Sequence, residues 1–223
     1  SPQAPSDLVV RAPDATPADV AAAASAARAA AAGGAREPAH ARAAALHACA
    51  EAVTAATGEL TDLVVREVGK PRGEAGAEIG RGVAILRYFA QQALHPEGEV
   101  YPPADGVSLL HTRRRPHGVV GLITPWNFPV AIPLWKAAPA LAFGNTVLLK
   151  PAPQSSAVAL RLAELFAGAL PPDASPANLT LMNRCSGRRR PSCRQGSSNF
   201  AQFGTQGCVS RPRQAAAKSL GAP

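Results

Sequence analysis

The sequence contains few residues of several kinds, and each shortage excludes a class of protein. Only four of the 223 residues are cysteines, and aromatic residues make up 4%. No two cysteines stand as Cys-x-x-Cys and no histidine pair completes a zinc pattern, so we expect neither a disulfide scaffold nor a metal site. An apolar secretory segment near the first residue is also lacking. We therefore expect reduced thiols and a cytoplasmic protein.

Long uninterrupted hydrophobic runs are lacking as well. The longest stretch without a charged residue, 116–135, has the length of a membrane span, but it contains four prolines and two glycines. A lipid-exposed helix is not expected from such a stretch. The apolar fraction of 47% is typical of a globular chain. We expect no membrane partner.

Acidic residues are absent from the last part of the chain. Residues 174–223 hold eight of the 23 Lys and Arg residues and none of the 15 Asp and Glu residues. The preceding 173 residues are balanced, so the net charge of +8 belongs to this tail. The tail has neither helical nor alternating periodicity, and we predict that 173–223 is a disordered basic tail. Its basic runs lack interleaved aromatic residues, so nucleic acid is not an expected partner.

The first 95 residues have the pattern of a helical layer. Thr16 followed by Pro17 predicts a helix start, and an Ala-rich run continues to Gly33-Gly34. Further helices are expected at about 38–56 and 59–68. A fourth helix carries apolar residues at helical spacing: Ile79, Val83, Leu86, Ala90 and Ala93.

The pattern then changes to alternating strands and helices. Residues 107–115 predict an extended ribbon, and 118–123 and 146–149 predict buried strands. Each of these two strands is followed by a helical segment, which is typical of a parallel sheet. The predicted fold class is α/β, with an incomplete Rossmann-like sheet in a domain at 1–172 and the tail at 173–223.

Two blocks of sequence resemble the aldehyde dehydrogenase superfamily. They read PWNFP at 125–129 and ALAFGNTVLLKP at 140–151. The similarity includes Arg66–Pro71 upstream, covers about three quarters of the chain, and is nearest to bacterial semialdehyde dehydrogenases. It implies the N-terminal part of an NAD- or NADP-dependent oxidoreductase that converts an aldehyde or semialdehyde to a carboxylate, and it implies that 1–172 is part of the cofactor-binding domain.

The resemblance assigns roles to individual residues. Asn127 matches the side chain that donates to the substrate oxygen, where it stabilises an oxyanion. Ile123, Thr124, Pro125 and Trp126 match the strand end that lines the cofactor cleft, and Lys150 matches a lysine that binds the adenosine ribose. Without the resemblance, Asn127 reads as a turn residue, Pro125-Trp126 as a core plug, and Lys150 as a solvated residue that ends a strand. Pro153 stands where many members have a glutamate, so the choice between NAD and NADP stays open.

The resemblance also implies what this chain does not contain. Residues 98–117 match part of a ribbon used for homo-oligomers, but the nucleophilic cysteine and the general-base glutamate have no counterpart. In the tail, residues 203–208 resemble a nucleophile loop with two residues reversed, so Cys208 is not expected to be a nucleophile. We therefore predict an inactive fragment whose tail comes from a foreign reading frame. The alternative is a non-catalytic subunit that docks on a full-length homologue.

Overall fold

The computed structural model describes residues 1–12 and 14–169, and the backbone of 179–181. The rest of the predicted tail lies outside the described residues. The elements are α1 (Pro17–Gly34), α2 (Ala39–Ala55), α3 (Thr57–Val68), α4 (Arg72–Gln92), β1 (Val100–Tyr101), β2 (Leu110–His111), β3 (Val119–Ile123), α5 (Ala131–Ala142), β4 (Thr146–Lys150), a 3-10 turn (Pro153–Ser155), α6 (Ser156–Ala169) and β5 (Leu179–Leu181).

The predicted helix starts and stops are confirmed where the local chemistry is strongest. At α1, the Thr16 hydroxyl accepts from the Asp19 amide at 3.2 Å, and the Asp19 carboxylate accepts from the Thr16 amide at 2.8 Å. This is a capping box, with Pro17 as the first helical residue. At the end of α3, Gly69 adopts the left-handed conformation with a φ of 73°.

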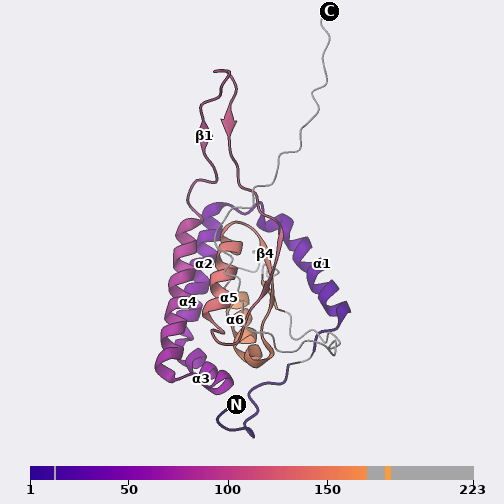
Figure 1. Ribbon diagram of the computed structural model, residues 1–223, viewed down its shortest axis with the longest axis vertical. Coiled ribbons are helices and arrows are strands. Elements are labelled where there is room, and N and C mark those ends of the chain that lie inside the picture. Colours follow the sequence, from indigo (N-terminus) through magenta and orange to yellow (C-terminus); the bar gives the residue numbers. More distant parts are fainter. Residues whose placement is uncertain (13, 170–178, 182–223) are drawn as a thin grey trace, which may run out of the picture. The chain divides into compact units, whose positions relative to one another are not determined.

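The parallel sheet lies between two helical layers (Figure 1). Its strand order is β3-β4-β5, and both neighbouring pairs are parallel. Helix α1 contacts the sheet on one face, while α5 and α6 cover the other. Helices α2, α3 and α4 form a further layer on α5 and α6. The predicted α/β class is confirmed.

The sheet has one strand more than the sequence indicated. Residues 179–181 pair with β4, with Val147 opposite Leu179 and Leu149 opposite Leu181. The expectation of disorder from residue 173 onward is therefore wrong for these three residues. A strand this short carries little periodic signal, and its hydrogen-bond acceptors and donors are supplied by β4, some thirty residues earlier in the chain.

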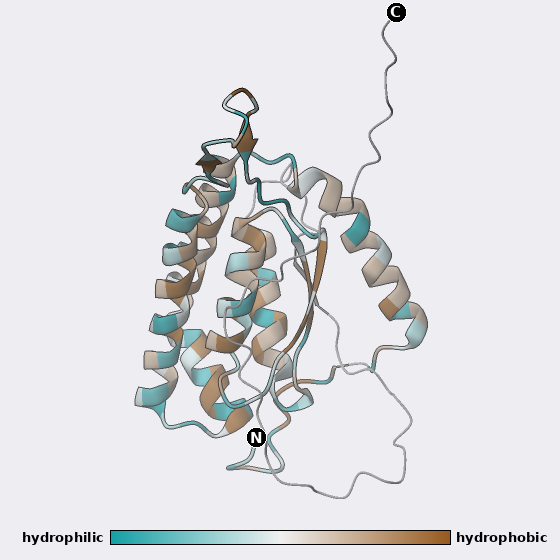
Figure 2. Ribbon diagram, turned by 45° about the horizontal axis from the view of Figure 1, so that its top comes forward, coloured by the Kyte–Doolittle hydropathy of each residue, from teal (hydrophilic) through white to brown (hydrophobic). Residues whose placement is uncertain are grey.

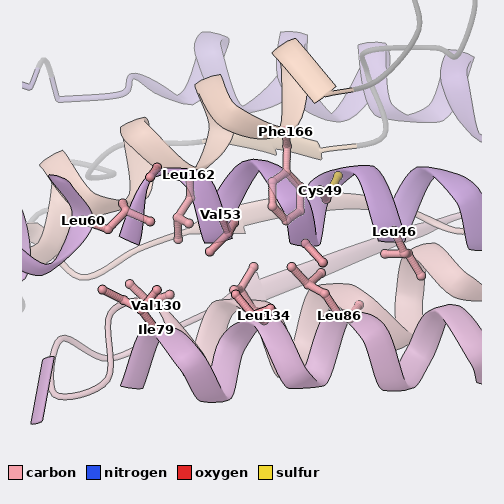
Figure 3. Close-up of a cluster of buried hydrophobic side chains, with 14 of the residues drawn as sticks. Leu46, Cys49, Val53, Leu60, Ile79, Leu86, Val130, Leu134, Leu162 and Phe166 are labelled. Atoms are coloured by element: carbon pink, nitrogen blue, oxygen red, sulfur yellow. The ribbon is translucent and has the colours of Figure 1, made fainter. Parts of the chain in front are cut away.

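The main core lies between the helices that cover the sheet and the outer helices (Figure 3). The apolar face predicted for the fourth helix is confirmed, because Ile79, Leu86 and Ala90 are fully buried. Other buried side chains in this core are Leu46, Cys49, Val53, Leu60, Val130, Leu134, Leu162 and Phe166. Burying each large side chain stabilises the fold by about 1.5–3 kcal/mol.

The predicted ribbon is an antiparallel pair, β1 with β2, that projects from the helices (Figure 1). Hydrophobic residues occur both in the buried strand β4 and in this ribbon (Figure 2). In the ribbon they are exposed: Val100, Val107, Leu109 and Leu110. Its use in oligomers stays a prediction. No helix within the described part of the chain is long and apolar enough to cross a membrane.

Candidate functional site

The predicted cofactor-cleft residues meet at the carboxyl edge of the parallel sheet. Ile123, the last residue of β3, is opposite Lys150, the last residue of β4. The Thr124 amide donates to the Lys150 carbonyl at 3.2 Å, and the Lys136 ammonium donates to the Ile123 carbonyl at 3.2 Å. Ligands of open α/β sheets bind outside this edge. The structure thus places these residues where a cofactor cleft is expected in this fold.

Two apolar side chains at this edge face solvent. Ile123 is 73% exposed and Trp126 is 50% exposed. The alternative that Pro125-Trp126 is a core plug is therefore wrong for Trp126. Pro125 itself is half-buried. An exposed isoleucine and indole beside a sheet edge offer apolar surface to the flat rings of a ligand.

The residue directly after Ile123 is buried and polar. Thr124 is 4% exposed, and its hydroxyl has no hydrogen-bond partner among the described residues. Buried hydroxyls are rarely left unpaired in folded proteins. The Thr124 hydroxyl at the carboxyl edge, together with Lys150 and the apolar side chains of Ile123 and Trp126, fits one side of a dinucleotide site.

The two other predicted site residues differ in their surroundings. Asn127 is exposed in the loop between β3 and α5, directly before Phe128 and Pro129. Lys150 is half-buried, and its ammonium donates to the Pro151 carbonyl at 3.1 Å. Lys150 is therefore not a fully solvated strand end. Asn127 lies at a bend directly before the turn at 129–130, and its side chain is exposed.

Sequence reasoning missed an ion pair under this loop. Lys70, between α3 and α4, is paired with Glu78 of α4. The Lys70 ammonium also donates to the Asn127 carbonyl at 2.8 Å and lies 4.1 Å from the centroid of the Phe128 ring. One signal in the sequence could have revealed the pair. Glu78 directly precedes Ile79, at the margin of the predicted apolar stripe of α4, where a carboxylate that becomes buried needs a partner.

Two carboxylates, the buried Glu78 and the half-buried Glu67, occupy the helix N-termini at this edge. Glu78 accepts from the Val130 and Ala131 amides at 2.8 and 3.0 Å, at the start of α5. Glu67 of α3 accepts from Ala157 and Val158, at 2.7 and 2.9 Å, at the start of α6. Helix N-termini commonly bind phosphate groups. Since carboxylates already occupy both, a pyrophosphate would have to be held by other parts of the protein.

The described residues contain one cysteine, and it is unsuited to nucleophilic catalysis. Cys49 is a residue of α2 that lies in the main hydrophobic core, and burial raises the pKa of its thiol to about 12. The reactive form of cysteine is the thiolate, which this environment disfavours. Within residues 1–12 and 14–169 no group of three or more His, Cys, Asp or Glu side chains is placed to hold a metal ion. Cys208 lies outside the described residues.

Curated relatives of the chain include semialdehyde dehydrogenases and a betaine aldehyde dehydrogenase. The α-ketoglutaric semialdehyde dehydrogenase of Bacillus subtilis is 48% identical over 108 residues, which are 48% of this chain and 22% of that protein. The α-ketoglutarate semialdehyde dehydrogenase of Haloferax volcanii is 39% identical over 173 residues, 78% of this chain and 36% of the relative. The chain thus spans between about a fifth and about a third of the length of these relatives.

Solved structures share the fold. PnpE in complex with nicotinamide adenine dinucleotide matches with a TM-score of 0.75 and 33% identity, covering 80% of this chain and 36% of that one. The glyceraldehyde-3-phosphate dehydrogenase GapN of Methanocaldococcus jannaschii, complexed with NADP, matches with a TM-score of 0.74 and 25% identity, covering 80% and 39%. A sequence model described as "Aldehyde dehydrogenase family" matches residues 1–179. The chain belongs to the aldehyde dehydrogenase family.

Proposed function

We propose that this chain is the N-terminal part of an NAD- or NADP-dependent enzyme that oxidises an aldehyde or semialdehyde to the carboxylate. The observation that carries the proposal is the grouping of Ile123, Thr124 and Lys150 at one sheet edge, beside the loop that carries Asn127. Semialdehydes are favoured as substrates because the two relatives described above, from Bacillus subtilis and Haloferax volcanii, are semialdehyde dehydrogenases.

In this proposal the chain supplies one side of the cofactor cleft. The Thr124 hydroxyl and the Lys150 ammonium are the hydrogen-bonding groups, and Ile123 and Trp126 are the apolar wall. A bound nicotinamide ring supplies the acceptor for the hydride that leaves the substrate. Because both helix N-termini at this edge hold carboxylates, the chain by itself binds the dinucleotide weakly.

Asn127 is the oxyanion donor in this proposal. Thiolate attack on an aldehyde produces a tetrahedral oxyanion, and one fixed amide donor stabilises such a charge by roughly 3–4 kcal/mol. The exposed position of Asn127, three residues after the buried Thr124, keeps its amide within reach of a substrate at the same edge. The donor has no effect until a thiolate has attacked the carbonyl.

We infer that the chain is inactive by itself. Cys49, the cysteine within the described residues, is buried in the core, and its pKa of about 12 keeps the thiol protonated at neutral pH. A nucleophilic cysteine therefore has to come from outside residues 1–12 and 14–169, the part of the chain whose side chains the structure describes. The full activity belongs to an enzyme about three times as long as the matched region.

The first test measures NADH or NADPH formation with a panel of short aldehydes and semialdehydes. The chain, Asn127→Ala and Cys208→Ser should all give no signal above the blank. Turnover by the chain that Cys208→Ser abolishes would overturn the inference of inactivity. A titration of Trp126 fluorescence in a Trp135→Phe background should show millimolar or weaker dinucleotide binding, reduced further by Lys150→Met but not by Arg87→Met on the exposed face of α4.

The second test restores the missing parts. Residues 1–172 are joined to the corresponding remainder of the Bacillus subtilis relative, and kcat is measured with and without Asn127→Ala. Loss of the donor should lower kcat by about 10²–10³-fold. A chimera that keeps its full kcat after Asn127→Ala would contradict the assignment of Asn127.

A second candidate function is a non-catalytic subunit that docks on a full-length homologue. The exposed apolar side chains of the β1–β2 ribbon favour it, since Val100 and Leu110 are both solvent-exposed on a two-stranded edge. Sedimentation of the chain mixed with a full-length homologue tests this candidate. The candidate is supported if a complex forms and is lost in the Val100→Lys and Leu110→Lys variants. It is rejected if no complex forms.

A further inference from the structure

Lys70 contacts the loop that carries Asn127. Its ammonium donates to the Asn127 backbone carbonyl at 2.8 Å and lies 4.1 Å from the centroid of the Phe128 ring. The Lys70 side chain is 11% exposed. Among the described residues, the bond from the Lys70 ammonium is the hydrogen bond made to Asn127. One buried cation therefore contacts two consecutive residues of the loop.

Glu78 reaches the end of the same loop. Its side chain is 0% exposed, it is paired with the Lys70 ammonium, and its Oε1 accepts from the Val130 and Ala131 amides. Lys70 thus holds the carbonyl of Asn127, while Glu78 holds the amides three and four residues later. The two side chains are held by each other, so the loop is attached to one ion pair at both points.

We propose that Lys70 and Glu78 are positioning residues that fix Asn127 in its place at the sheet edge. The proposal rests on the proposed function for the importance of Asn127, but the positioning itself is a property of the free chain. Electrostatic attraction between buried groups is stronger than between exposed ones, because little water screens it. An ion pair in this setting restricts the loop more than a solvated contact could.

Alternative anchors lie at the margins of the loop. The Thr124 amide and the Lys136 ammonium hold residues at the end of β3, before the loop turns. The Phe128 carbonyl accepts from the Ile132 amide, which belongs to the first turn of α5. None of these contacts is made by Asn127 itself, which is bonded by Lys70. Replacing Lys70 should therefore displace Asn127 while the strand and the helix remain in place.

The test observes Asn127 directly. The full 223-residue chain is labelled with ¹⁵N-asparagine, and the side-chain amide signals are recorded without aldehyde or cofactor. Asn127→Ala identifies the Asn127 signals by their loss. Asn145, whose amide donates to the Ala140 carbonyl at 3.1 Å inside the fold, is the internal reference. We expect Lys70→Met to shift the Asn127 signals by more than their linewidth or to broaden them, and to leave the Asn145 signals in place. Lys70→Arg should return the Asn127 signals part of the way to their original positions.

Two further variants separate positioning from folding. Lys70→Met leaves the Glu78 carboxylate buried without its cation, which can unfold a protein. The double variant Lys70→Met with Glu78→Gln removes that charge but keeps an acceptor for Val130 and Ala131, so it should melt near the parent temperature and still displace the Asn127 signals. Arg72→Met, which breaks an exposed pair with Asp62 near Lys70, is the matched control and should leave them unmoved.

Unmoved Asn127 signals in the folded double variant would overturn the proposal, as would an equal displacement in Arg72→Met. Because the spectra are recorded without substrate or cofactor, this result does not depend on whether the chain is catalytically active. Failure of the proposed function would be seen in the turnover and dinucleotide titrations, and failure of the positioning proposal in these spectra.

Discussion

Helices α5 and α6 begin in the same way but in different electrostatic surroundings. Each follows a parallel strand, and each has its first amides bound by a carboxylate from an outer helix: Glu78 of α4 for α5, and Glu67 of α3 for α6. Glu78 is paired with Lys70. Glu67 forms no ion pair among the described residues, and burial is the largest influence on its pKa, which is raised above the ordinary value.

The carboxylate charges at the two helix starts have different partners. A carboxylate at a helix N-terminus is favoured by the amides and the helix dipole. At α5 the buried charge is also balanced by a cation, so the loop with Asn127 is held by a neutral cluster. At α6 the amides of Ala157 and Val158 offset only part of the burial cost of Glu67, and protonation is correspondingly easier.

The largest expected effect is the loss of the anchor. Glu78→Ala removes the acceptor of two buried amides and leaves the Lys70 ammonium, which is largely buried, without its counter-ion. Breaking a buried pair in this way costs about 3–5 kcal/mol. Urea unfolding followed by circular dichroism should show this loss in the free energy of unfolding. Glu74→Ala, an exposed residue one turn earlier on α4, is the control and should change it by less than about 0.5 kcal/mol.

A smaller loss is expected at the start of α6. Glu67→Ala leaves the Ala157 and Val158 amides without their acceptor but leaves no cation unpaired. Unsatisfied buried amides cost about 1–3 kcal/mol. The same unfolding measurement should place Glu67→Ala between Glu78→Ala and Asp62→Ala, which breaks only the exposed pair of α3 with Arg72. If Glu67→Ala destabilised the chain as much as Glu78→Ala, the unpaired Lys70 would add nothing to the loss of free energy of unfolding.

Much of this arrangement could be predicted from the sequence, and the reasons are local. Thr16 and Asp19 are three residues apart and form their cap by themselves, and the apolar stripe of α4 is visible in the spacing from Ile79 to Ala90. The parallel arrangement of β3 and β4 follows from two apolar runs joined by one helix, whereas the pairing of Ile123 with Lys150 comes from the structure.

What could not be predicted depends on contacts between distant parts of the chain. Glu67 meets Ala157 across 90 residues, and Glu78 meets Val130 across 52. No periodicity encodes which helix N-terminus a given carboxylate will reach. Strand β5 is three residues long, and only the free edge of β4 makes it a strand. Trp126 was open to two interpretations because its exposure depends on what packs beside it.

The smallest expected effect is a dependence of stability on pH that belongs to Glu67 alone. Burial raises its pKa from the ordinary value of 4.5, and the amides at the start of α6 lower it only in part. Between the ordinary pKa and the raised one, the folded chain keeps a proton that the unfolded chain releases. The contribution of Glu67 to the free energy of unfolding is therefore full below the ordinary pKa and falls as the pH rises through the raised one.

Other carboxylates change stability in the opposite direction, so the effect has to be isolated as a difference. Hydrogen bonds lower the pKa of Asp19 and Asp105, which favours folding as the pH rises. The free energy of unfolding is measured from about pH 4 to about pH 8 for the chain and for Glu67→Gln, which keeps one acceptor oxygen and does not titrate. The chain should lose stability relative to Glu67→Gln as the pH rises and then run parallel to it. A constant difference at every pH would show that burial does not raise the pKa of Glu67.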